Sequence, residues 1–214
     1  MKFNSQIQNR GSFKADWNIE DIKNEPMFFN CNLDYAYQHG GPITKEFILK
    51  LPHDWWTSSN LVLDSRVHML MKNWYPCIPG WHHDDIPRST STGQPNYLTP
   101  EYRAEHLSGL VNAEICPTTF IIGPVEVSEP DINTRIYNRW HDEIETMSHL
   151  EKYQVKSGEY IQFNGESFHS GVKAIDNGWR WFIRLSRNTG RQNKITNEIR
   201  RQVQVYLEHP TEGW

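Results

Sequence analysis

Two histidines followed directly by two aspartates stand in residues 79–88, which read Pro-Gly-Trp-His-His-Asp-Asp-Ile-Pro-Arg. On an extended segment side chains alternate between two faces, so the run contains two interleaved His-x-Asp pairs, His82 with Asp84 and His83 with Asp85. Imidazole and carboxylate groups are both common metal ligands in proteins. Either pair could therefore present one imidazole and one carboxylate to a single ion.

A second imidazole is available at His169. The segment Gly-Glu-Tyr-Ile-Gln-Phe at residues 158–163 alternates in polarity like a strand and leads to a turn that carries His169. Two histidines and one carboxylate occupy one face of an octahedral metal and leave three positions open, which is the arrangement of non-haem Fe(II) oxygenases. The sequence therefore predicts an iron site built from two distant segments.

Two arginines follow His169 on the next predicted strand. In residues 178–187 strand alternation places Arg180, Arg184 and Ser186 on one face and large apolar residues on the other. A guanidinium is a planar fork of donors that matches the geometry of a carboxylate. Either arginine could bind the far carboxylate of a dicarboxylate that chelates the metal.

In these features the chain resembles the Fe(II)- and 2-oxoglutarate-dependent dioxygenases. The resemblance covers residues 73–88 and 158–186, and it rests on His-x-Asp, the strand leading to His169, and an arginine followed by an Arg-x-Ser ending. It implies a mainly β fold, a double-stranded β-helix of the jelly-roll or cupin type with supporting α-helices. The strand-rich pattern of the sequence agrees with that fold.

The resemblance also implies roles for individual residues. Trp-His-x-Asp-Asp is the form seen in the alkylation-repair branch, which favours His82 and Asp84 as ligands and leaves His83 and Asp85 as the alternative. Both Arg180 and Arg184 remain candidates for the co-substrate, because each matches a different branch. The implied iron ligands are His82, Asp84 and His169, and the implied 2-oxoglutarate contacts are Arg180, Arg184, Ser186 and, from an Asn-x-Tyr element, Tyr75.

The reaction implied is oxidation of a second substrate by O2 with conversion of 2-oxoglutarate to succinate and CO2. Because Asp84 is a carboxylate rather than the Gly or Ala of the halogenating branch, hydroxylation is expected, while desaturation and ring closure stay open. A small molecule, amino acid or peptide is the expected substrate. Two alternatives remain: a metal-binding cupin without oxygenase activity that binds sugars, isomerises or senses, and an oxygenase that acts on nucleic acid.

Composition restricts the partners. The 214 residues carry a formal charge of −4 and no basic stripe, which argues against nucleic acid and anionic membranes. Three widely spaced cysteines indicate neither a disulfide framework nor a Cys-x-x-Cys zinc site. With no long apolar run and a polar N-terminus, we expect a cytoplasmic protein. The sequence says nothing of the oligomeric state.

One domain, 1–214, is expected, with a core at about 60–190. Hydrophobic periodicity and breakers predict the supporting elements. They are a helix at 44–51, strands at 61–63 and 67–74, a lid-like loop at 87–106, two strands within 113–127, an inserted helix at 132–153 and a C-terminal helix at 193–208.

Two further features have competing interpretations. His141 and Glu143 form a rival His-x-Glu pair, but a helical context would turn residues two apart to different faces. Arg88, just after the His-Asp run, could contact a substrate or cap its own loop.

Overall fold

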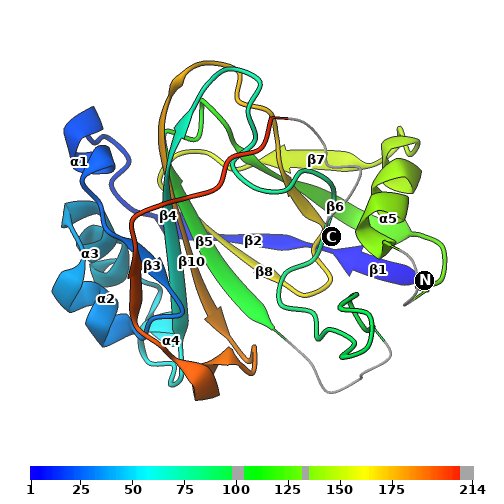
Figure 1. Ribbon diagram of the computed structural model, residues 1–214, viewed down its shortest axis with the longest axis horizontal. Helices are drawn as coiled ribbons and strands as arrows, with labels where there is room; N and C mark the ends of the chain where they lie inside the picture. The colour runs from blue at the N-terminus through cyan, green and yellow to red at the C-terminus, as the bar shows by residue number, and fades with distance from the viewer. Residues whose placement is uncertain (98–103, 132–134, 208–214) are drawn as a thin grey trace.

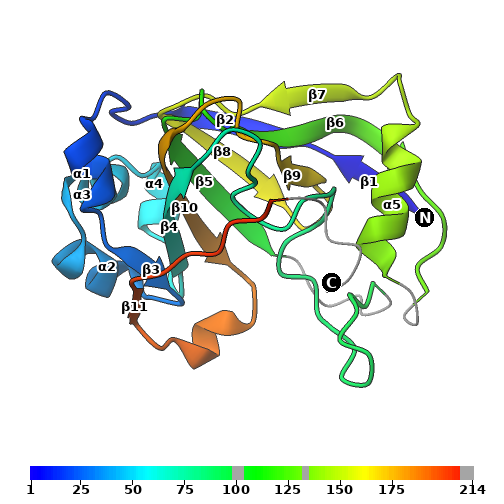
Figure 2. The same cartoon turned by 45° about the horizontal axis from the view of Figure 1, so that its top comes forward.

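The computed structural model describes residues 1–97, 104–131 and 135–207, and its strands form two principal antiparallel sheets, seen as two layers in Figure 2. The larger sheet has the order β2-β8-β5-β10-β4, and the smaller has the order β1-β6-β7 with β9 also paired to β6. The strands are β1 (Lys2–Ser5), β2 (Ile7–Ser12), β3 (Met27–Phe29), β4 (Val62–Leu70), β5 (Glu105–Val111), β6 (Thr118–Glu126), β7 (Glu151–Gln154), β8 (Glu159–Asn164), β9 (His169–Gly171), β10 (Gly178–Arg187) and β11 (Glu198–Arg200).

The chain crosses between the two layers several times. It passes from the small sheet to the large one between β1 and β2, returns between β5 and β6, and crosses again between β7 and β8, between β8 and β9 and between β9 and β10. Two sheets linked by repeated crossings are the arrangement of jelly-roll folds. The expected fold class, mainly β with a jelly-roll core and supporting helices, is confirmed.

Helices cover the outer face of the large sheet (Figure 1). They are α1 (Ile19–Lys23), α2 (Leu33–His39), α3 (Pro42–Leu49) and α4 (His53–Trp56), while α5 (Ile136–Glu145) lies beside the small sheet. Trp181, Ile183 and Leu185 of β10 are fully buried in one cluster with Phe47 and Trp55 from the helices. None of the helices in the described part of the chain is long and apolar enough to cross a membrane.

The opposite face of β10 points between the two sheets. Because side chains alternate along a strand, packing of Trp181, Ile183 and Leu185 against the helices turns Arg180 and Arg184 inward. The alternation of side chains in the sequence did not show which face of the strand is internal, and the packing of the helices does. The cationic face of the strand lines the interior.

The helix predicted at 44–51 is confirmed as α3, although it begins two residues earlier. Pro42 occupies the first turn, where its missing N–H costs nothing. The cap comes from a distant residue: the buried carboxylate of Glu25 accepts hydrogen bonds from the Ile43 N–H at 2.6 Å and the Thr44 hydroxyl at 2.7 Å. A local search for a capping residue could not find it.

Two predictions for strands are wrong in detail. The expected strands at 61–63 and 67–74 are one strand, β4, and the two expected within 113–127 are one strand, β6. Gly123, at φ +109°, bends β6 without ending it. The lid-like loop predicted at 87–106 can be compared with the structure only in part, because residues 98–103 lie outside the described residues. Residues 87–97 form a loop, and β5 already begins at Glu105.

The helix predicted at 132–153 is too long. Its described part is α5, which ends at Glu145, and residues 132–134 lie outside the description. The following residues 151–154 form β7 and pair with β6. Met147 and Leu150, which continued the helical period, pack on the same cluster as α5 from the turn after it. The open edge of β6 outweighs the local helical preference.

The C-terminal helix predicted at 193–208 is also wrong. A 3-10 turn, η1 (Arg191–Lys194), is followed by β11, which pairs with β3, and by an extended run that ends in a backbone pair between Tyr206 and Tyr75. Asn197 adopts φ +51°, a conformation that interrupts a right-handed helix. Residues 198–206 are called the C-terminal strap below, and residue 208 lies outside the described residues.

Candidate metal centre

His82 and His169 lie opposite one another on adjacent chain segments. Each backbone N–H donates to the other residue's carbonyl oxygen at 3.1 Å, and the two ring centroids are 4.5 Å apart. His169 opens β9, which is itself paired with β6. The main chain thus holds both imidazoles in place before any ligand binds.

Together with Asp84 these residues form a group with metal-ligand spacing. One donor atom from each of His82, Asp84 and His169 lies within 4.8 Å of the others. The Nδ1 atom of His82 lies 2.8 Å from the Gly80 carbonyl, and that of His169 lies 3.0 Å from the Ser167 carbonyl. Because a carbonyl oxygen only accepts hydrogen bonds, Nδ1 carries a proton in both rings. Nε2 is therefore the atom that each imidazole can offer to a metal ion. Histidines that bind a metal through one ring nitrogen typically donate a hydrogen bond from the other, as these two do.

The contact between His169 and Asp84 tests whether a cation fits. Nε2 of His169 lies 3.1 Å from Oδ2 of Asp84. Since Nδ1 of this ring already donates to a carbonyl, two electron-rich atoms face each other unless a proton or metal ion lies between them. Two ligand atoms at right angles about 2.1 Å from a shared ion would lie roughly 3 Å apart. The donor set therefore fits a metal ion.

The surroundings of Asp84 and His82 favour the protonation states that bind a metal ion, the ionised carboxylate and the neutral imidazole. Burial alone would raise the pKa of Asp84, but Arg184 and His169 lower that pKa well below its usual value. Burial, together with the neighbouring His169, lowers the pKa of His82 to about 4. At neutral pH the carboxylate is thus ionised and the His82 imidazole is neutral, as metal ligation requires.

The alternative pair, His83 and Asp85, is not brought together with His169. His83 turns to the other side of the segment, where its ring lies 3.9 Å from that of Phe168 and its Nδ1 lies 2.8 Å from the Tyr97 hydroxyl. Asp85 adopts φ +53°, which ends the strand-like alternation and turns its carboxylate toward Arg191, 3.2 Å away. His83 and Asp85 therefore contact Phe168, Tyr97 and Arg191 and do not contribute to the group formed by His82, Asp84 and His169.

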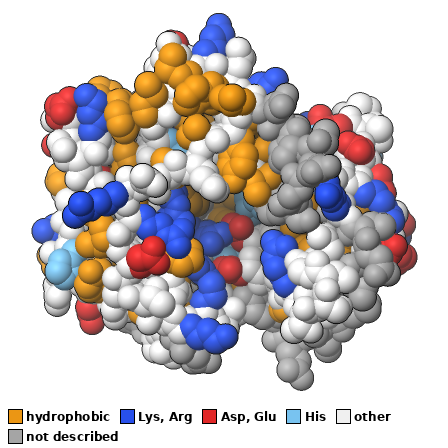
Figure 3. Space-filling view, viewed as in Figure 1, with side chains coloured by type: hydrophobic (Ala, Val, Ile, Leu, Met, Phe, Trp, Pro, Cys, Tyr) orange, Lys and Arg blue, Asp and Glu red, His pale blue; other side chains and the backbone are white. Residues whose placement is uncertain are grey.

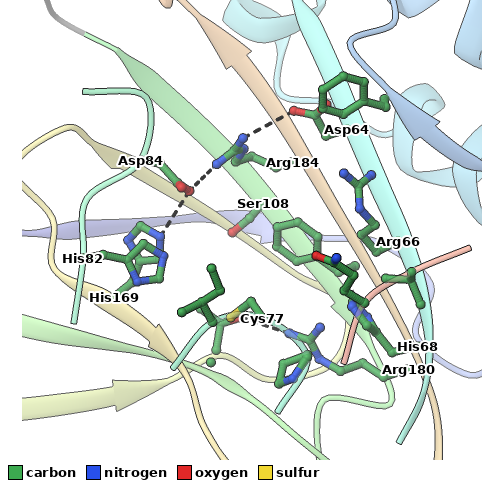
Figure 4. A pocket seen from close by; sticks show the side chains of 18 of the residues that line it. Asp64, Arg66, His68, Cys77, His82, Asp84, Ser108, His169, Arg180 and Arg184 are labelled. Atoms are coloured by element: carbon green, nitrogen blue, oxygen red, sulfur yellow. Dashed lines mark hydrogen bonds and ion pairs between the residues drawn. The ribbon is translucent and has the colours of Figure 1, made fainter. Parts of the chain in front are cut away.

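A cavity of about 580 Å³ lies beside the three candidate ligands and extends between the sheets to the C-terminal strap. Figure 4 shows His82, Asp84 and His169 on one side, with Arg180 and Arg184 from β10 on the other. The rings of Phe120 and Phe163 pack on His169, with centroids 5.4 and 5.1 Å from its own. Two aromatic rings thus pack against the imidazole of His169.

Arg180 and Arg184 differ in their partners. Arg184 pairs with Asp84 through Nη1 and with Asp64 at 3.3 Å, and these carboxylates raise its pKa. Arg180 is only 2% exposed, and within the described residues no carboxylate pairs with it. Its Nη2 donates to the Thr118 hydroxyl at 3.0 Å and its Nε has no hydrogen-bond partner.

A buried cation without a carboxylate partner is energetically costly, and an anion that entered the cavity would reduce that cost. Arg184, by contrast, is already balanced by carboxylates of the chain. The two arginines therefore share a strand face but differ in whether a carboxylate pairs with them.

The remaining predicted residues lie elsewhere. Tyr75 is not among the residues that line the cavity; its neighbours Pro76 and Cys77 are, and Tyr75 itself pairs with Tyr206 through the backbone. The Ser186 hydroxyl lies 2.8 Å from Nδ1 of the buried His106, also outside that lining. The Arg88 guanidinium donates to the Gly93 carbonyl at 2.8 Å and so caps its own loop.

The rival pair of the inserted helix does not form a joint site. Nδ1 of His141 accepts a hydrogen bond from the Trp81 N–H at 3.4 Å. Glu143 instead accepts hydrogen bonds from the backbone N–H and the hydroxyl of Ser128. The two side chains hold different parts of the chain, as expected for residues two apart on a helix.

Several cavity residues escaped sequence reasoning. On β4, which pairs with β10 in the large sheet, Asp64, Arg66 and His68 stand at every second position and line the cavity. Polar residues at every second position of an otherwise apolar strand were a readable signal for this inward face. Arg191 and Arg200 had no such signal, because the folding of the C-terminal segment over the cavity decides their position.

Comparisons with known proteins bear on the fold only. No protein-family model and no curated protein matches the sequence. Among solved structures, EvdO2 from Micromonospora carbonacea var. aurantiaca, complexed with 2-oxoglutarate, is 14% identical over 68% of this chain and 59% of its own, with a TM-score of 0.40. HygX from Streptomyces hygroscopicus, with iron bound, is 10% identical over 86% and 82%, also with a TM-score of 0.40.

A third similar structure is an N-substituted L-amino acid dioxygenase from Burkholderia ambifaria, 14% identical over 58% of this chain and 47% of its own, with a TM-score of 0.34. This chain thus spans about half to three fifths of the length of EvdO2 and this dioxygenase. At such identities and TM-scores the likeness assigns neither an activity nor a substrate to the chain.

Proposed function

We propose that the protein is a non-haem Fe(II)- and 2-oxoglutarate-dependent oxygenase that hydroxylates a small molecule, amino acid or peptide. His82, Asp84 and His169 would hold the iron, and Arg180 would bind the far carboxylate of 2-oxoglutarate. One mole each of O2 and 2-oxoglutarate would be consumed, giving succinate, CO2 and a substrate in which a C–H bond has become C–OH.

One observation carries this proposal. The backbone pair between His82 and His169 places two Nδ1-anchored imidazoles beside an ionised carboxylate, in the same cavity as a buried arginine that has no carboxylate partner in the described residues. A metal site alone would fit many cupins. The added cation is what a chelating dicarboxylate requires.

The side chains of the protein have separate tasks in this function. The Gly80 and Ser167 carbonyls orient the two imidazoles, and Arg184 keeps Asp84 ionised. Phe120 and Phe163 pack on the ring of His169. Ferrous iron bound there would supply the oxygen chemistry that couples decarboxylation of 2-oxoglutarate to oxidation of the second substrate. The protein supplies the geometry and the charge of the site.

The size of the cavity supports a small substrate. A volume of about 580 Å³ lies within the range of small-molecule sites, roughly 300–1,000 Å³. It must hold 2-oxoglutarate and at least part of the second substrate. A small molecule, or a single side chain of a peptide, is therefore the proposed substrate class.

Anaerobic reconstitution with Fe(II) and 2-oxoglutarate tests the proposal. We expect a weak visible charge-transfer band on mixing and succinate on admission of O2. His82→Ala and His169→Ala proteins should lose both signals, whereas His39→Ala, which removes an exposed imidazole, should keep them. If the parent gives neither signal and behaves like the two ligand variants, the proposed function is wrong.

A further inference from the structure

The mouth of the cavity carries more positive charge than the proposed co-substrate needs. Five arginines line the cavity against two aspartates, although the chain as a whole is negative. Figure 3 shows Lys and Arg side chains gathered around a hollow in the middle of this face, with acidic side chains within it. The arginines are Arg66, Arg180, Arg184, Arg191 and Arg200.

Most of these cations are already compensated. Arg184 pairs with Asp64 and Asp84, and Arg191 pairs with Asp64 at 2.8 Å and with Asp85 at 3.2 Å. Arg180 is assigned above to 2-oxoglutarate.

Arg66 and Arg200 remain. Arg66 donates through Nη1 to the Phe28 and Ser65 carbonyls, and within the described residues it forms no ion pair with a carboxylate. Arg200, on the C-terminal strap, pairs with Glu198 at 2.8 Å. Glu198 does not line the cavity. The mouth therefore holds one guanidinium with no carboxylate partner and a second one beside it.

These two guanidinium groups share one aromatic ring. The central carbon of Arg200 lies 3.5 Å from the centroid of Phe29, and that of Arg66 lies 5.7 Å from it. Burial lowers the pKa of Arg66, the carboxylate of Asp64 opposes that shift, and the positive charge of Arg200 adds to it. An anion in this cavity that contacts both guanidinium groups would offset their mutual repulsion and accept charge-assisted hydrogen bonds from them.

The register of the sheet separates this pair from the co-substrate arginine. Arg180 lies opposite His68, whereas Arg66 lies opposite Phe182, so Arg66 and Arg180 are diagonal neighbours on adjacent strands. Diagonal neighbours are about 7–8 Å apart. Two anionic groups can thus bind at the same time, one at each arginine.

We propose that the second substrate carries an oxyanion, a carboxylate or a phosphate, and that Arg66 and Arg200 bind it at the mouth of the cavity. This inference rests on the proposed function and narrows its substrate class. The C-terminal strap then has a binding role, because Arg200 on the strap lines the same cavity as Arg66 of β4.

Calorimetric titration tests the inference without turnover. The protein is loaded with Ni(II) and saturating 2-oxoglutarate, and then titrated with inorganic phosphate, with sulfate and with acetate at constant ionic strength. We expect saturable binding of at least one oxyanion to the parent, and a loss of at least tenfold in affinity in Arg66→Gln. Preference for acetate over phosphate or the reverse identifies the kind of oxyanion.

Two controls complete the design. Lys2→Gln removes one positive charge from an exposed pair with Glu126 and should bind the oxyanion like the parent. Affinity for 2-oxoglutarate should be unchanged in Arg66→Gln. Arg200→Gln, on the strap, should weaken oxyanion binding as well, and it provides the second variant if Arg66→Gln does not fold.

The inference is overturned if the loaded parent binds no oxyanion, if Arg66→Gln and Arg200→Gln bind it as the parent does, or if Arg66→Gln loses 2-oxoglutarate in equal measure. Failure of the proposed function would instead be seen as no binding of 2-oxoglutarate to the parent. In that event the oxyanion is titrated into two further proteins, Arg180→Gln and the double variant Arg180→Gln/Arg66→Gln, so that binding at Arg180 is removed from both. Equal oxyanion affinities in these two proteins would overturn the inference.

Discussion

The imidazoles of His82 and His169 belong to an antiparallel backbone pair, with both N–H to O distances at 3.1 Å. The pair joins the start of the His-Asp run to the start of β9, so the ring positions follow from sheet geometry. Ligands held by paired backbone are placed more precisely than ligands on free loops.

The two neighbouring aspartates should differ in their effect on metal binding. Asp84→Asn should lower the affinity for Ni(II) or Fe(II) by more than about 100-fold, because even second-shell changes cost roughly 10–100-fold. Asp85→Asn should change that affinity far less, and asparagine tolerates the φ of +53° at this position. Calorimetry with the metal measures both. Equal losses would mean that both carboxylates act as ligands.

Metal binding should stabilise the fold, and removal of the metal should reverse the effect. At a metal concentration about 100 times the dissociation constant the expected gain is about 2.7 kcal/mol. Thermal unfolding with Ni(II), and again after addition of EDTA, measures it. His169→Ala should show no gain, while His39→Ala, which lacks an exposed ring, should respond like the parent. A gain that survives in His169→Ala would place the ion elsewhere.

The two arginines of β10 should separate in a co-substrate titration. Arg180→Gln should lower the affinity of the metal-loaded protein for 2-oxoglutarate roughly 10–100-fold, the equivalent of one or two charge-assisted hydrogen bonds. Arg184→Gln should lower it by less than about threefold, since carboxylates of the chain already balance that charge. The opposite order of effects would assign the co-substrate to Arg184.

Glu25 should make stability depend on pH. Burial raises its pKa above the ordinary value of 4.5, even though Thr44 and the start of α3 donate to it. A raised folded-state pKa contributes stability that is full below pH 4.5 and is lost as the pH rises through the folded-state value. Denaturant unfolding across this range should show a decline in the parent that Glu25→Gln lacks. Parallel curves for the two proteins would contradict it.

The sequence by itself determined the parts of this protein that depend on local alternation. His82 and Asp84 share a face because they are two apart on an extended segment, and residues 158–163 predict a strand that leads to His169. The mainly β class followed from the same patterns. These features need no knowledge of distant contacts.

Tertiary structure decided what alternation leaves open. Which face of β10 is internal depended on the helices that bury Trp181, and the pairing of Arg184 with a carboxylate depended on Asp64 of a different strand. The C-terminal segment became a strap because β3 offered it an edge. Pairing across a sheet and compensation of charge are properties of residues far apart in the chain, so no local pattern could state them.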